Sequence, residues 1–283
     1  MARTAHKPKK AKRKRSRRSW AGVARPAARC ILLIAVIAAA CVGLARMDHW
    51  VHGRPAFAAP ARVMLVNAPD DLVDAIRTTL SPFEHHPWSR AGLCREISDA
   101  LESDPWVERV LSVRRFGDGR IDVRCRYRTP VAMVQTPDGF LLVDGAGVRL
   151  PGVYEYDAAY MLIQGVTTPP PAPGEVWDTG QVCCGVQLVR LLDGEAFADQ
   201  ITAVLVHNYK GRQDRSAPQL ELATTRPGGR IIWGSPIGEE IEENSAAEKL
   251  ELLRANYARF GRADANRRVI DVSVLPDRTY IPT

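Results

Sequence analysis

Apolar and polar positions divide the chain into one uniformly apolar stretch and a longer part with periodic patterns. Residues 30–45 are all apolar and lie between Arg29 and Arg46. Sixteen residues in a helix span about 24 Å, against a hydrocarbon core of about 30 Å. Arginines at both ends can extend toward the headgroups and make up the difference. The pattern predicts a single transmembrane helix over residues 30–46, followed by a Pro-containing linker over 47–61.

Residues 62–128 show the patterns of a small mixed domain. Leu93, Ile97 and Leu101 recur every four residues, which is typical of one face of a helix. Two alternating segments flank Gly117-Asp118-Gly119, which favours a hairpin. Strands are expected at 62–66, 107–115 and 121–127, and helices at 70–77 and 89–102. The predicted order is β-α-α-β-β.

Residues 129–283 are dominated by strand patterns. Helices are predicted over 185–193 and 245–260. Ser245 and Glu248 have the spacing of a capping box for the second of these, and Gly261 ends it. Strands are expected at 131–134, 140–143, 201–206, 220–223, 231–233, 269–275 and 279–281. The fold class is therefore predicted as α+β, with a mainly antiparallel β domain that also carries helices.

Charge separates the N-terminus from the rest of the chain. Residues 1–29 hold twelve Lys/Arg and no acid, whereas the remainder holds 27 Lys/Arg against 32 Asp/Glu. An excess of Lys/Arg beside a span keeps that side in the cytoplasm, so the tail is expected inside and the later domains outside. Nucleic-acid binding is not expected, because the tail offers only Trp20 for stacking. A cleaved signal peptide is the alternative to an anchor.

No catalytic or metal site is predicted. His85-His86 lack the spacing of a helical metal pair, Ser235 lacks a nucleophile elbow, and the acids at 239–243 are typical of a solvated face. No cofactor or small-molecule substrate is expected. For Cys94 and Cys125, a disulfide and two free thiols both stay open.

Several motifs occur in an order that is similar to a known family. Residues 104–110 read Asp-Pro-Trp-Val-Glu-Arg-Val, residues 127–132 read Tyr-Arg-Thr-Pro-Val-Ala, and residues 140–147 read Phe-Leu-Leu-Val-Asp-Gly-Ala-Gly. Together with the helix around Lys249 and the strand at 269–272, they resemble the FtsQ/DivIB family of bacterial cell-division proteins. The resemblance implies a POTRA domain over 62–128 and a β domain over 129–283. The POTRA motif consists of Pro105, Trp106, Val107 and Val110.

The resemblance also implies a function. Members of this family are non-catalytic proteins of the cytoplasmic (inner) membrane at the division septum, where they bind FtsB- and FtsL-type partners and link them to septal wall synthesis. Their last strand accepts a strand from FtsB, and the matching positions here are Arg278, Thr279, Tyr280 and Ile281. Tyr280 is the expected aromatic anchor. The family often has Asp-x-Arg nearby, but here Asp271 is followed by Val272 and Ser273, which leaves the partner of Asp271 open.

Two other classes of protein are compatible with parts of the pattern. POTRA-type modules also serve as docking components of envelope protein assembly or secretion, usually beside a long barrel of alternating strands. A membrane-anchored wall hydrolase or transferase would need a nucleophile or paired carboxylates, and the sequence offers no clear set.

Overall fold

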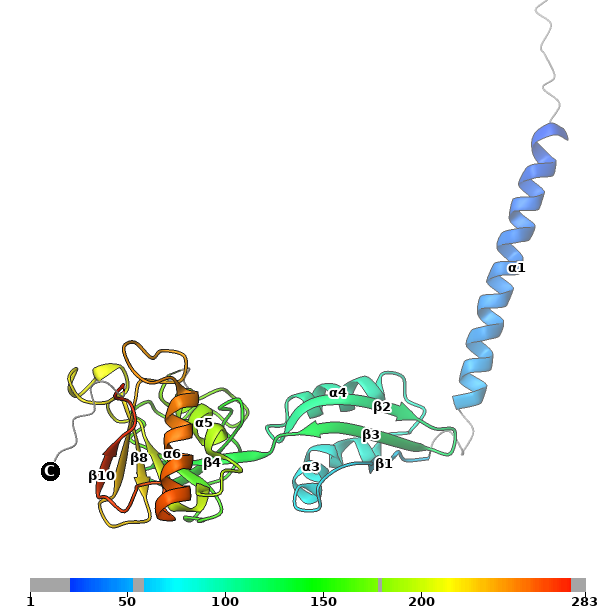
Figure 1. Ribbon diagram of the computed structural model, residues 1–283. Helices are drawn as coiled ribbons and strands as arrows, with labels where there is room; N and C mark the ends of the chain where they lie inside the picture. The colour runs from blue at the N-terminus through cyan, green and yellow to red at the C-terminus, as the bar shows by residue number, and fades with distance from the viewer. Residues whose placement is uncertain (1–20, 53–58, 178–179, 276–283) are drawn as a thin grey trace, which may run out of the picture. The chain divides into compact units, whose positions relative to one another are not determined.

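The computed structural model describes residues 21–52, 59–177 and 180–275 (Figure 1). The chain divides into two compact units, Met1–Ala58 and Ala59–Thr283. In the first unit, α1 (Ala21–His52) is a continuous helix whose large apolar side chains from Leu32 to Trp50 are exposed. Of the helices in the described ranges, none is both long enough and apolar enough to cross a membrane.

The bounds of α1 differ from the predicted ones at both ends. The helix begins inside the predicted tail, and it continues through residues 47–52, which were expected to be linker. The physical reason at the C-terminal end is that residues 47–52 contain no helix breaker, and the first Gly and Pro come at Gly53 and Pro55.

The second unit begins with the predicted β-α-α-β-β order, with one short 3₁₀ helix added. Within the described residues its strands form a three-stranded sheet, here called the small sheet, in the order β1-β3-β2. β1 runs parallel to β3, and β2 runs antiparallel to it. The elements are β1 (Arg62–Leu65), α3 (Val73–Leu80), η1 (Ser81–His85), α4 (Leu93–Glu102), β2 (Val107–Arg115) and β3 (Arg120–Tyr127).

One face of the small sheet is buried by the two helices. Leu93, Ile97 and Leu101 of α4 are fully buried, as their spacing predicts. Ile121 and Val123 of β3 are equally buried on the face toward the helices. Burying side chains of this size stabilises the fold by roughly 1.5–3 kcal/mol each.

Within the described residues, the remaining strands form a second sheet, here called the large sheet, in the order β10-β9-β8-β7-β6-β4-β5. The strands are β4 (Pro130–Thr136), β5 (Gly139–Asp144), β6 (Met161–Gln164), β7 (Ile201–Leu205), β8 (Leu220–Thr224), β9 (Arg230–Gly234) and β10 (Val269–Asp271). The neighbours β10/β9, β7/β6 and β6/β4 are parallel, and the other pairs are antiparallel. The expectation of a mainly antiparallel sheet is therefore wrong. Crossover connections cause the difference. A helix joins β6 to β7 and β9 to β10 and returns the chain in the same direction, whereas β4 and β6 are connected through β5 and the loop after it.

The helices of the crossovers are α5 (Gln181–Leu192) and α6 (Ala246–Phe260), and the short 3₁₀ helices are η2 (Ala198–Gln200) and η3 (Tyr209–Gly211). α5 and α6 cover one face of the large sheet (Figure 1). Trp177, Phe197 and Trp233 are the largest side chains in the core between them. The structure is thus α+β with mixed sheets.

Cys94 and Cys125 are free thiols in the structure. Cys125 is buried in the small sheet, and burial raises the pKa of its thiol. Of the two alternatives left open by the sequence, the structure has the free thiols.

Candidate partner-binding site

The β10 end of the large sheet is the candidate site for a partner strand. β10 pairs with β9 only: the Arg230 N–H donates to the Arg268 carbonyl (2.8 Å), and the Val272 N–H donates to the Ile232 carbonyl (3.1 Å). Because backbone groups of alternate residues point to opposite sides of a strand, those of Val269 and Asp271 point away from β9. No strand among the described residues pairs with that outer side.

Asn244 fixes the chain that follows β10. Its backbone N–H donates to the Ser273 carbonyl (2.8 Å), and its Nδ2 donates to the carbonyls of Val272 (2.9 Å) and Val274 (2.7 Å). The side chain is almost fully buried. Asn244 therefore holds the segment 272–274 through its backbone and its side chain, in addition to the one bond from Val272 to β9.

A buried ion pair lies under the same end of the sheet. Lys249 of α6 is fully buried, and its Nζ donates to Glu243 Oε2 at 3.0 Å and lies 5.3 Å from the centre of the Trp233 ring. Glu243 also accepts hydrogen bonds from the backbone N–H (3.0 Å) and the hydroxyl (2.9 Å) of Ser235. These contacts tie the loop after β9 to the first turns of α6.

The electrostatics of Glu243 follow from this arrangement. Partial burial alone would raise the pKa of its carboxyl, but the Ser235 N–H and the Lys249 ammonium outweigh burial and hold the pKa below its usual range. The carboxylate is thus charged at neutral pH and has three donors. It serves as a structural link between Ser235 and Lys249.

Local sequence explains why α6 and β9 end where they do. Ser245 caps α6 by the predicted capping box, in which Glu248 completes the second hydrogen bond. Gly261 ends the helix with φ +69°. At the end of β9, Gly234 has φ +90°, and a Cβ there would collide with the Glu243 carboxylate. Only glycine allows this close approach.

The predicted partner-binding residues Arg278, Thr279, Tyr280 and Ile281 lie outside the described residues. The partner of Asp271, which the sequence left open, is local. Its carboxylate accepts hydrogen bonds from the Ser273 N–H (2.9 Å) and hydroxyl (2.6 Å). These bonds form a local bend in the chain after Asp271. β10 consequently ends there and not at the predicted Leu275.

The motif residues Pro105, Trp106, Val107 and Val110 lie at the entry to β2. Asp104 accepts hydrogen bonds from the Trp106 N–H (2.9 Å) and from the Thr79 hydroxyl (2.5 Å), which fixes the turn. Val107 is the first, buried residue of β2, and Val110 is half-buried within it.

Trp106 packs against a second apolar cluster, which belongs to the large sheet. This cluster consists of Met133, Leu142, Leu150, Leu162, Ala203 and Leu205. The Arg128 guanidinium, between β3 and β4, pairs at 2.7 Å with Asp144 at the end of β5. The predicted motif therefore connects the small-sheet and large-sheet segments, which accounts for it as a structural feature.

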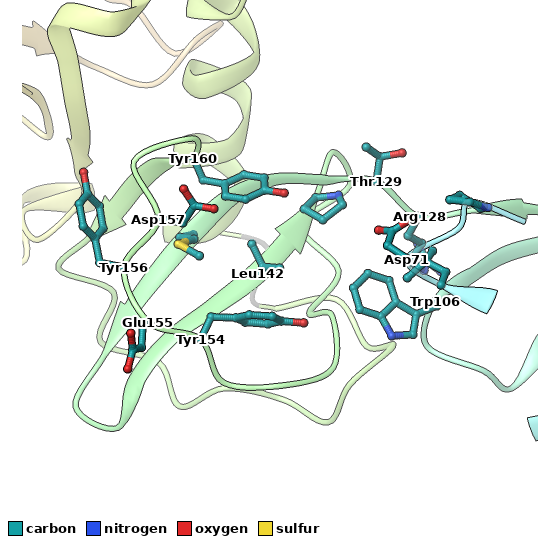
Figure 2. A pocket seen from close by; sticks show the side chains of 14 residues that line it. Asp71, Trp106, Arg128, Thr129, Leu142, Tyr154, Glu155, Tyr156, Asp157 and Tyr160 are labelled. Carbon is teal, nitrogen blue, oxygen red and sulfur yellow. The ribbon is translucent and has the colours of Figure 1, made fainter. Parts of the chain in front are cut away.

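A cleft of about 650 Å³ opens beside Trp106 (Figure 2). Sequence reasoning missed this cleft, because its wall comes from the loop at 151–160, for which no element was predicted. The spacing of its tyrosines is the signal that could have indicated it. Its aromatic residues are Trp106, Tyr154, Tyr156 and Tyr160, and its carboxylates are Asp71, Glu155 and Asp157.

The residues weighed for catalysis have ordinary surroundings. His85 ends η1, and the Ser235 hydroxyl donates to Glu243. In the part of the chain that the structure describes, no three His, Cys, Asp or Glu side chains are grouped so that they could hold a metal ion.

Comparison with models of known protein families gives no match, and comparison with curated proteins gives none either.

Proposed function

We propose that this chain is a non-catalytic, single-span membrane protein of the bacterial division machinery, similar to FtsQ/DivIB. In this proposal it binds FtsB- and FtsL-type partners at the β10 end of the large sheet and links them to septal wall synthesis. The observation that carries the proposal is the contrast between the two edges of that sheet. One is covered by the chain's own loop, and the other has no covering strand among the described residues.

Strand addition is the binding mode that this edge supports. An added strand gains affinity from main-chain hydrogen bonds and specificity from alternate side chains. Among the described residues, no strand pairs with the outward backbone groups of Val269 and Asp271, which can form such bonds. The predicted contact residues 278–281 follow β10 by only a few positions in the sequence. Tyr280 is the proposed aromatic anchor.

The membrane anchor is part of the same proposal. Support comes from the twelve Lys/Arg before residue 30, the uniformly apolar residues 30–45, and the exposed apolar side chains of α1. This arrangement favours a cytoplasmic N-terminus and folded domains on the outer side of the inner membrane.

Localisation in dividing cells tests the function. A fluorescent protein is fused to the cytoplasmic N-terminus in the source bacterium, and the native copy is depleted. The proposal predicts a ring at mid-cell and filamentous growth on depletion. Uniform envelope signal with normal division would contradict it and would favour a role in envelope protein assembly or secretion.

A further inference from the structure

The outer face of the small sheet carries an unusual concentration of arginine. Ile121, Val123 and Cys125 of β3 point toward the helices, so the alternate residues of β3 point to the opposite face. The strand register places residues of β1 and β2 beside them. We call this the arginine face, and it consists of Arg62, Arg109, Arg114, Arg120, Arg124 and Arg126.

Two pairs of these arginines lie directly opposite each other. Arg62 is the register partner of Arg120, and Arg109 is the register partner of Arg126. Like charges in directly opposed positions destabilise a sheet. Fold stability therefore does not explain this pattern, and an anionic ligand would relieve the repulsion.

Neighbouring acids neutralise only half of the charge. Arg62 lies 3.9 Å from Asp118, Arg120 lies 3.0 Å from Asp122, and Arg126 lies 3.7 Å from Glu108. By contrast, Arg109, Arg114 and Arg124 are exposed and form no ion pair with any residue in the described part of the chain. The face has a net positive charge with its guanidinium groups open to solvent.

Exposed apolar side chains border the same face. Met64 lies opposite Asp122, Leu111 lies in the irregular part of β2, and Phe116 lies at the β2–β3 turn with the Arg120 guanidinium 4.4 Å from its ring centre. A basic surface with apolar and aromatic side chains at its margin is typical of protein surfaces that bind at a lipid interface.

We propose that the arginine face binds the anionic headgroups of phospholipids in the membrane that holds α1. This inference rests on the anchor in the proposed function. Ten residue steps separate His52, the end of α1, from Arg62, and ten residues reach at most about 35 Å. The tether therefore limits the distance between Arg62 and the end of α1, which allows the face to reach the bilayer surface. Guanidinium groups suit this ligand, because their planar fork matches phosphate oxygens and is weakly hydrated.

Photocrosslinking of the full chain in vesicles tests the proposal. Photoreactive p-benzoylphenylalanine replaces Ser112, the register partner of Arg124, or, as a control, Asp99 on the exposed side of α4. The vesicles contain phosphatidylcholine alone or phosphatidylcholine with phosphatidylglycerol. Lipid adducts are expected at position 112 and not at 99, and only where phosphatidylglycerol is present.

A matched pair of double variants distinguishes the effect of the arginine face from the effect of the protein's overall charge. R114Q/R124Q removes two arginines of the face, and R77Q/R95Q removes two exposed arginines of α3 and α4. Each arginine near an anionic surface favours binding by a factor of roughly five. The adduct at position 112 should therefore fall several-fold in R114Q/R124Q and stay unchanged in R77Q/R95Q.

The outcomes distinguish this inference from the proposed function. Adducts at 112 that do not depend on phosphatidylglycerol or on Arg114 and Arg124 would overturn lipid binding and leave partner binding intact. Extraction of the protein from the vesicles by alkaline carbonate would overturn the anchor, and the inference with it. Crosslinks from position 112 to an acidic protein in intact cells, in place of lipid, would likewise overturn it.

Discussion

The two edges of the large sheet are protected in different ways. At the β5 edge, the Tyr154 N–H donates to the Phe140 carbonyl (2.8 Å), the Phe140 N–H donates back (3.1 Å), and the Leu150 N–H donates to the Leu142 carbonyl (2.9 Å). At the β10 edge, none of the described residues forms a comparable ladder on the outer side. Proteins usually cover or blunt an exposed edge, because it pairs readily with other chains. The contrast therefore indicates where a partner strand can add.

The support of the two edges differs as well. The β5 edge is held by backbone pairing and by the apolar cluster around Leu142 and Leu150. The β10 edge is held by side chains that lie beneath it, namely Asn244 and the Glu243–Lys249 pair. Changes at these polar side chains should therefore affect the β10 edge without affecting the β5 edge.

The largest effect is expected from Glu243→Gln. This change leaves the fully buried Lys249 ammonium without a counter-ion, and breaking a buried ion pair costs about 3 kcal/mol. The measurement is the free energy of unfolding in urea. Glu239→Gln, an exposed change in the same loop, is the control and should cost less than about 0.5 kcal/mol.

A double variant sharpens that result. Glu243→Gln combined with Lys249→Met removes both charges, and most of the lost stability should return. If the double variant is as unstable as Glu243→Gln, the ion pair is not what stabilises this region.

Asn244→Ala should have the next largest effect. It removes the hydrogen bonds to the buried carbonyl of Val272 and the partly buried carbonyl of Val274, at a cost of about 2 kcal/mol. Amide hydrogen exchange gives the measurement. Exchange should become faster at Val272 beside β10 and stay unchanged at Tyr154 beside the covered edge. Equal acceleration at both places would contradict local anchoring.

The stability of the second unit should fall in acid. The folded-state pKa of Glu243 is below its usual range, for the reasons given above. For Asp264, burial is again the largest single influence and is outweighed by Arg262, so its pKa is also lowered. Acids with a depressed folded-state pKa contribute stability above their unfolded pKa and lose it as pH falls through the folded one.

The pH range in which stability is lost follows from the lowered pKa values of Glu243 and Asp264. Unfolding free energy should be constant above about pH 5, since unfolded Asp and Glu titrate near 4, and should decline below it. Urea titrations between neutral pH and pH 3 measure this decline. It should be shallower in the Glu243→Gln/Lys249→Met variant, and an equal slope would exclude a contribution from Glu243.

The smallest effect concerns the small sheet, whose outer face is uncovered. Arg109→Thr removes one of two opposed arginines and should stabilise the fold by a few tenths of a kcal/mol. Most substitutions destabilise, so a gain is a specific prediction. Urea unfolding measures it, with Arg95→Thr on α4 as the control. A loss of stability would show that Arg109 supports the fold.

Local sequence patterns predict the helices and strands of this protein better than they predict which strands pair. The capping box of α6 and the apolar spacing of α4 are readable because each depends on residues three or four apart. β6 was missed because Met161–Gln164 is short and has one β-branched residue. Its parallel pairing with β4 and β7 depends on crossovers that are set by tertiary packing.

The candidate site was predictable only in part. The sequence draws attention to Asp271 because Val272 and Ser273 follow it. Its bond to Ser273, however, depends on the bend at the end of β10. Asn244 reaches carbonyls about thirty residues away, and the Glu243–Lys249 pair depends on burial. No residue pattern along the chain contains these long-range relations.

Affinity for a partner strand tests the central claim most directly. The full chain in vesicles is titrated with the labelled outer segment of the FtsB-type protein from the same bacterium. Tyr280→Ala and Thr279→Pro should weaken binding at least tenfold, since aromatic anchors and main-chain donors dominate such interfaces. Tyr156→Ala, an exposed tyrosine beside the covered β5 edge, is the matched control and should leave the Kd unchanged. An unchanged Kd in both folded variants, or an equal loss in the control, would contradict the assignment of the partner site to the β10 end.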